Sequence, residues 1–220
     1  MNAMNDEKRL EVVNNLAKLG YVKTFIHSIA FGTLKPMLSK DDHSTLNQKN
    51  IDADYQKREL DNNDLENLIL KNNSGGAVWA TSSDVTIKNS SIESNTNSNF
   101  GGGVYVTNCI KLTLDDVVVK NNTANQGGGV YVDNTPVAFS GTVSLLNNHA
   151  STEGGGISFN SAAANQLLTN LVIAGNTAGT RGAGVVIGLN SFYIKKSTIV
   201  NNVSSYAAGV FVSHNATVDI

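Results

Sequence analysis

The chain has 220 residues and a formal net charge of −2 at pH 7. This near-neutral balance argues against a nucleic-acid-binding protein, which would carry a basic stripe. The single cysteine excludes an intramolecular disulfide framework and a cysteine-based zinc site. No apolar run reaches the roughly 18 residues that a membrane-spanning helix needs, so no membrane span is expected.

The first predicted unit is residues 1–64, which are charged and contain only two of the 20 glycines. Apolar residues from Leu10 to Leu19 lie on one helical stripe, and Gly20 follows the last of them as a helix C-cap would. Acidic residues occupy the positions where a secretory signal needs basic ones, so no signal peptide is expected. We therefore expect a short, partly helical segment that caps the rest of the chain or links to it.

Residues 65–220 contain an internal repeat marked by two independent signatures. The first is a glycine-rich run before a β-branched residue, and its six copies start at Gly75, Gly101, Gly127, Gly154, Gly182 and Ala207. The second is an aliphatic residue, two variable residues and an asparagine, and its copies end at Asn73, Asn95, Asn122, Asn148, Asn176 and Asn202. Both signatures keep the same spacing, so the sequence predicts about six repeats of ~26 residues.

Each repeat contains short runs of β-branched residues that alternate with period two, which is typical of strands with one buried face. Three such strands joined by tight turns account for one repeat, and no stretch has a helical period. This pattern predicts an all-β fold, a parallel β-helix solenoid in which each repeat forms one coil and coils stack about 4.8 Å apart. A leucine-rich repeat has a similar length, but it requires nearly invariant leucine and has no place for glycine triplets.

The two signatures have separate structural roles in this prediction. Asparagine at a fixed turn position adopts the left-handed conformation and bonds the asparagine of the next coil, forming a ladder. Glycine supplies positive φ angles or allows the backbones to approach closely at a corner.

The paired signatures resemble the repeats of the chlamydial polymorphic outer-membrane proteins, whose autotransporter passengers carry Gly-Gly-Ala-Ile and Phe-x-x-Asn tetrapeptides. The run from Gly75 to Val78 is similar to the first tetrapeptide, and the run from Ile92 to Asn95 is similar to the second, with an aliphatic residue in place of Phe. The resemblance implies a right-handed parallel β-helix with an adhesin-like role, on the cell surface or outside the cell. It implies no catalytic residues.

One row of outward side chains is the candidate binding surface. The middle position of the strand after each glycine run reads, in chain order, Trp79, Tyr105, Tyr131, Ser158, Val186 and Phe211. The first three would place aromatic rings side by side on the outer face, where they could stack on a glycan or anchor a cell-surface protein. The alternative is that the N-terminal segment or an inter-turn loop packs over these rings.

An enzyme is the main alternative, because parallel β-helices also include polysaccharide lyases and hydrolases. Glycoside hydrolysis needs two carboxylates at a fixed separation, but the aligned repeats place Asp133 and Glu153 in different columns. The four histidines have no partner at ligand spacing, and the glycine runs lack the Lys-Ser/Thr of a phosphate loop. The sequence thus predicts no catalytic residue, metal or cofactor and favours a non-catalytic surface module. A structural spacer in a longer surface protein is the third hypothesis.

Overall fold

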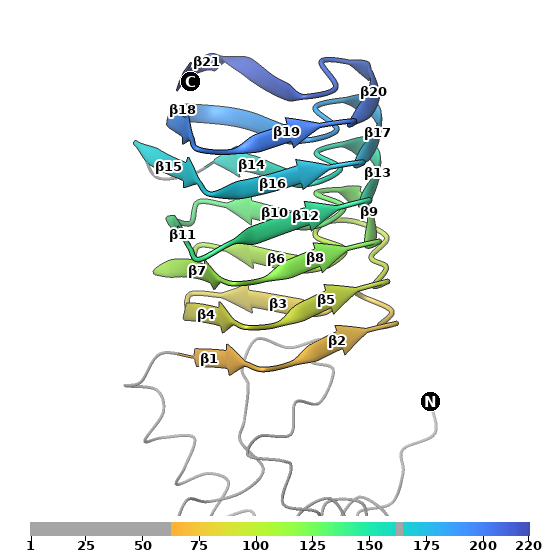
Figure 1. Cartoon of the computed structure of the whole chain (residues 1–220), viewed down its shortest axis with the longest axis vertical. Coiled ribbons are helices and arrows are strands. Elements are labelled where there is room, and N and C mark those ends of the chain that lie inside the picture. Colours follow the sequence, from red (N-terminus) through yellow and green to blue (C-terminus); the bar gives the residue numbers. More distant parts are fainter. Residues whose placement is uncertain (1–62, 162–164) are drawn as a thin grey trace, which may run out of the picture. The chain divides into compact units, whose positions relative to one another are not determined.

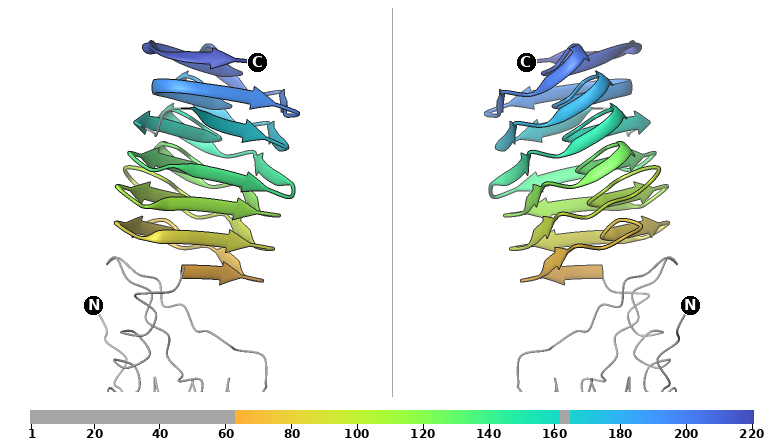
Figure 2. Two further views of the ribbon diagram at one scale, coloured as in Figure 1. Left: turned by 90° about the vertical axis from the view of Figure 1, so that its left-hand side faces the viewer. Right: turned by 90° about the vertical axis from the view of Figure 1, so that its right-hand side faces the viewer.

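A computed structural model describes residues 63–161 and 165–220 of the chain. In these ranges the protein is all-β, with 21 strands that wind into a stack of coils (Figure 1). Views from two sides show the strands of successive coils lying above one another (Figure 2). The helix expected between Leu10 and Leu19 lies outside the described residues.

Strands at the same place in successive coils pair in parallel and form sheets that run along the stack. Sheet A contains β1 (Asn63–Glu66), β4 (Asp84–Lys88), β7 (Lys111–Asp115) and β11 (Val137–Ser140). Sheet B contains β2 (Ile69–Lys71), β5 (Ser91–Glu93), β8 (Val118–Lys120), β12 (Val143–Leu146), β16 (Leu171–Ala174) and β19 (Thr198–Val200).

The other two sheets complete each coil. Sheet C contains β9 (Thr123–Gln126), β13 (His149–Glu153), β17 (Thr177–Arg181) and β20 (Val203–Tyr206). Sheet D contains β3 (Val78–Thr81), β6 (Val104–Thr107), β10 (Val130–Asp133), β14 (Ile157–Ser161), β18 (Val185–Lys195), β21 (Val210–Asp219) and β15 (Gln166–Thr169). The long strand β18 continues round a corner, so that its first part pairs with β14 and its last part with β15.

The core consists of inward side chains stacked on their equivalents in the neighbouring coils. Val130 pairs with Val104 on one side and Ile157 on the other, and all three are fully buried. Aliphatic columns of this kind on sheets A, B and D remove apolar surface from water along the stack. The predicted parallel solenoid of about six coils is therefore confirmed.

Sheet C is a fourth strand position that the sequence does not reveal. Its inward residues are the small side chains of Ala124, Ala150 and Ala178, all buried. A strand with one small inward residue has no large alternating apolar pattern, so its sequence is easily taken for a turn. Each coil therefore has up to four strands instead of the predicted three.

The predicted asparagine ladder is present along the corner between sheets B and C. The side-chain Nδ2 of Asn122 donates to Oδ1 of Asn148 (3.0 Å) and to the carbonyl oxygen of Ile92 (2.9 Å). Its own Oδ1 accepts from Nδ2 and from the backbone N–H of Asn95, both at 2.9 Å. The same bonds connect successive asparagines from Asn73 to Asn202, so these buried amides are paired, as burial of a polar group requires.

The left-handed conformation expected of the ladder asparagines occurs one residue earlier, and that detail of the prediction is wrong. Positive φ angles occur at Asn72, Ser94, Asn121, Asn147, Gly175 and Asn201. The preceding residue makes the turn, which leaves the ladder asparagine free to point its amide into the stack. Asparagine is common at both positions because it tolerates positive φ and because its amide both donates and accepts.

The glycine runs have the two roles that the sequence predicts. The first glycine of a run has positive φ, as at Gly101 (φ 62°). The third allows close stacking, because a Cβ placed on Gly129 would lie 2.5 Å from the carbonyl oxygen of Gly156 in the next coil. The runs therefore set the corner between sheets C and D.

Candidate functional site

The outer face of sheet D places the predicted aromatic residues on adjacent strands. Parallel pairing sets Trp79 on β3 beside Tyr105 on β6, and Tyr105 beside Tyr131 on β10. The ring centroids are 6.0 Å apart in the first pair and 5.7 Å apart in the second. The alignment of the repeats predicted this order, because each coil repeats the backbone of the one before it.

Phe100 is part of this aromatic cluster, although the sequence analysis did not identify it as a site residue. Its ring lies 4.6 Å from that of Tyr131 and 5.9 Å from that of Tyr105. It belongs to the corner segment before Gly101, where it pairs with Gln126 of the next coil. An aromatic residue at a corner position where most other coils carry polar ones is the signal that could have identified it.

Phe100 changes which rings face solvent. Trp79 is 37% exposed, Phe100 is 36% exposed and Tyr105 is partly exposed, whereas Tyr131 is only 5% exposed. The ring of Phe100, from the inter-turn segment before Gly101, lies against the ring of Tyr131. We call Trp79, Phe100 and Tyr105 the aromatic patch.

Burial raises the pKa of Tyr131 to about 12, and the charges of Asp133 and Glu153 add to the shift. A buried phenol resists ionisation because the phenolate loses its hydration. The side chains of Tyr131 and Asp133 share the outward face of β10, two residues apart, and Glu153 lies in the corner column of the following coil. Negative charge therefore lies close to Tyr131, the buried ring against which Phe100 of the patch lies.

A polar column runs beside the aromatic one, at the ends of the same strands. The carboxylate of Asp133 accepts hydrogen bonds from Oγ1 of Thr107 (3.2 Å) and from Nδ2 of Asn160 (2.9 Å). In the adjacent turn, Asn134 donates to Oδ1 of Asn108 at 2.8 Å. These bonds connect neighbouring coils, so the polar side chains are held in place on a surface that remains partly exposed.

A second column lies on the other side of the aromatic row of sheet D. It consists of the residues that precede each glycine run, at the end of the sheet C strands. Glu153 and Arg181 are aligned there, and their Oε2 and Nε atoms lie 2.5 Å apart. The guanidinium of Arg181 also lies over the ring of Phe211, 4.7 Å from its centroid. Arg181 thus reaches the strand residue of the following coil, as Phe100 does with Tyr131.

The two acids that the sequence singles out as catalytic candidates, Asp133 and Glu153, lie on different coils. Asp133 lies at the end of β10, whereas Glu153 lies before the glycine corner that precedes β14, so the two acids occupy opposite ends of the sheet D face. Nδ1 of His149 is 2.8 Å from the hydroxyl of Thr177, on the outer side of sheet C. In residues 63–161 and 165–220, no group of three or more His, Cys, Asp or Glu residues has the geometry to hold a metal ion.

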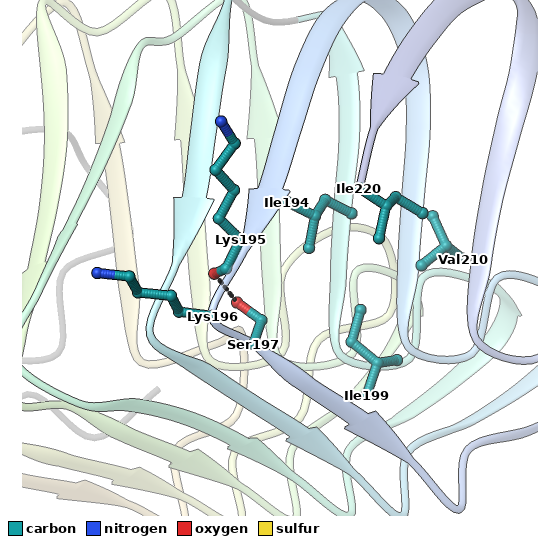
Figure 3. Close-up of a pocket in the computed structure, with 7 residues that line it drawn as sticks. All are labelled: Ile194, Lys195, Lys196, Ser197, Ile199, Val210 and Ile220. Atoms are coloured by element: carbon teal, nitrogen blue, oxygen red, sulfur yellow. Dashed lines mark hydrogen bonds between the residues drawn. The ribbon is translucent and has the colours of Figure 1, made fainter.

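An opening lies at the coil formed by β18, β19 and β21, away from the aromatic patch. It has a volume of about 580 Å³ and is bordered by the apolar side chains of Ile194, Ile199, Val210 and Ile220 (Figure 3). The ammonium ends of Lys195 and Lys196 extend away from these side chains. Ile199 and Val210 continue the core columns of the preceding coils, so the opening is bordered mainly by core side chains, with Ser197 and the two lysines at its edge.

The stacked coils, parallel sheets and asparagine ladder agree with a comparison against protein families. Residues 51–220 match the right-handed beta helix region. The chain belongs to this family.

No curated protein and no solved structure matches this right-handed β-helix. Among the residues described, no helix has the length and apolar character needed to cross a membrane. The family match supports the fold but does not specify a function.

Proposed function

We propose that this right-handed β-helix is a non-catalytic, adhesin-like module that binds glycan through the aromatic patch on sheet D. The observation that carries the proposal is the clustering of Trp79, Phe100 and Tyr105. Two of these rings expose more than a third of their surface, and the three come from two strands and a corner. A cluster of exposed rings on a rigid scaffold is typical of a binding surface.

A glycan fits this surface better than an apolar partner. The C–H face of a pyranose stacks on an aromatic ring, while its hydroxyl groups need hydrogen-bonding partners at the edge of the ring. The patch is bordered by Asp133 and Asn108 on one side and by Gln126 on the other, and all three side chains are at least partly exposed. The resemblance to autotransporter passenger repeats supports a role at the cell surface or outside the cell.

The arrangement of acids favours binding over hydrolysis. Glycosidases place their two carboxyl groups about 5 to 10 Å apart around the scissile bond. Asp133 and Glu153 lie at opposite ends of the sheet D strands, and each is already held by a neighbour, Asp133 by Thr107 and Glu153 by Arg181. This arrangement supports binding, because the two candidate acids face different neighbours on different coils.

The decisive experiment uses Trp79, because it is the single tryptophan of the chain. Oligosaccharides that stack on the patch should shift or quench its fluorescence, and a glycan array with calorimetry should identify those that bind. Trp79→Ala should abolish binding while the β-rich circular dichroism persists. Tyr193→Ala is the matched control, since Tyr193 is 36% exposed on β18, outside the patch.

Other outcomes would contradict the proposal. If the array shows no binding, the chain acts as a structural spacer. Equal loss of binding in the Trp79 and Tyr193 variants would show that the patch is not the site. Release of cleaved saccharide, lost in Asp133→Asn or Glu153→Gln, would establish an enzyme.

A further inference from the structure

We infer that the glycan is an uncharged saccharide chain that crosses the strands of sheet D, with Asp133 binding its hydroxyl groups. This inference rests on the proposed function and goes beyond it, since it names the charge class of the ligand, its direction and a specificity-determining residue. It follows from three features of sheet D: the position of the Asp133 carboxylate, its hydrogen bonds and the charges around it.

Asp133 is positioned to reach a ligand on the patch. It lies on the outward face of β10, two residues after Tyr131, and Tyr131 lies beneath Phe100 and beside Tyr105. Residues two apart on a strand point to the same face and lie about 7 Å from each other. A saccharide ring stacked on Phe100 or Tyr105 therefore has its edge near the Asp133 carboxylate.

The carboxylate is oriented but retains capacity to accept further hydrogen bonds. Thr107 donates to Oδ2 and Asn160 donates to Oδ1, so two neighbouring coils hold the group in place. A carboxylate has about four acceptor sites, and the structure shows protein donors at two of them. Pairs of sugar hydroxyl groups are suitable donors for the remaining sites, and such charge-assisted bonds are strong.

The charge of Asp133 selects against acidic ligands. Both of its donors are neutral, and within the described residues it takes part in no ion pair with lysine, arginine or histidine. The guanidinium of Arg181, in the corner column, is paired with Glu153. A uronic acid or a sulfated sugar on the patch would bring a second negative charge close to Asp133, and this repulsion discriminates against such ligands.

The same geometry gives the direction of the ligand. Trp79 lies on β3, Tyr105 on the next strand β6, and Asp133 on the strand after that, β10. Two strand spacings correspond to about 10 Å along the stack. An oligosaccharide that contacts both Trp79 and Asp133 must therefore cross the strands, advancing about 10 Å along the axis of the solenoid and about 7 Å along the strands.

The test compares oligosaccharides of glucose and of galacturonic acid, matched in length, by the fluorescence of Trp79 and by calorimetry. The intact chain should bind the neutral series at least about tenfold more tightly than the acidic one. Asp133→Asn is isosteric and keeps donors and acceptors for Thr107 and Asn160. It should weaken neutral binding about tenfold and reduce the discrimination against the acidic series. Asp115→Asn on sheet A makes the same change in net charge and should alter neither.

The possible results distinguish failure of this inference from failure of the proposed function. If both series bind equally, or if Asp133→Asn binds the neutral series as the unmodified chain does, the inference is overturned. Loss of binding in Trp79→Ala would then still support the aromatic patch as a glycan site. If neither series binds the unmodified chain while other glycans on the array do, the saccharide class is wrong; if none binds, the proposed function fails with it.

Discussion

Phe100 lies against Tyr131 with ring centroids 4.6 Å apart, and this contact connects the corner of one coil to a strand of the next. In this contact the ring of Phe100 faces solvent, and the ring of Tyr131 is buried beneath it. The contact has consequences for ionisation that are measurable without any ligand.

Phe100→Ala should lower the pKa of Tyr131 from about 12 toward the usual tyrosine value near 10. Removing the covering ring admits water, which stabilises the phenolate. Absorbance titration of the folded protein, compared with the same titration of Tyr131→Phe, isolates the signal of this one tyrosine. The loss of the ring contact should also lower the free energy of unfolding by about 1 kcal/mol. An unchanged Tyr131 titration would show that another group covers the phenol.

Alkaline pH should destabilise the fold through Tyr131. Its pKa is about 12 in the folded chain against 10.0 for an ordinary tyrosine, so the folded state holds this proton more tightly. The stabilisation is complete below pH 10 and is lost as the pH rises toward 12, by at most about 2 to 3 kcal/mol.

Denaturant unfolding at about pH 9 and about pH 12 measures this loss. Tyr131→Phe should lose less stability over that interval than the unmodified chain, because phenylalanine has no proton to release. Identical losses in the two proteins would contradict the assignment of the shift to burial of Tyr131.

Asn122→Ala should lower the free energy of unfolding by about 3 to 5 kcal/mol. The side chain is fully buried, and its removal leaves the two donors of Asn95 and the carbonyl of Ile92 without their partner. Asn73→Ala is the control, because Asn73 is partly exposed and its side chain donates to Oδ1 of Asn95, so its removal takes no acceptor from a buried donor. Its cost should be about 1 kcal/mol, and equal costs at the two positions would contradict a role for ladder burial.

Gly129→Ala should lower the free energy of unfolding by about 1 to 3 kcal/mol, because the added methyl group would meet the carbonyl oxygen of Gly156 at 2.5 Å. Gly209 occupies the same place in its run, but a Cβ there would have only the side chain of Ile199 nearby, at 4.0 Å. Gly209→Ala should therefore change stability by less than about 0.5 kcal/mol. Chemical denaturation of the two variants gives the comparison, and equal effects would exclude close backbone stacking as the cause.

The spacing of the repeats predicts which residues lie side by side. Asn122 between Asn95 and Asn148, and Tyr105 between Trp79 and Tyr131, follow because each coil repeats the backbone of the previous one. The parallel register and the buried aliphatic columns need no further information. These features depend on the chain period alone, so they are readable from the sequence.

The exposed surface depends on how far side chains reach between coils, which the period does not encode. Phe100 aligns with Glu153 and Arg181 in the corner column, but its position over Tyr131 depends on the turn before Gly101 and on its rotamer. Sheet C was likewise not evident, because Ala124 and its equivalents bury too little apolar surface to produce a pattern. The sequence therefore predicts which aromatic residues of the candidate site lie on adjacent strands, but it does not predict which of their rings are exposed.

The bonds that Asn122 makes to its two neighbours are the same in kind and direction as those of Asn148. Because the ladder asparagines are equivalent, a complete coil could be duplicated or deleted and the hydrogen-bonded ladder would still be continuous. An insertion of a few residues would instead move the next asparagine out of its place in the ladder. The solenoid can therefore gain or lose length only in whole coils. Duplication of one coil lengthens the outer face by one strand and adds one outward residue to the row on sheet D. The inward columns and the asparagine ladder keep the same pattern.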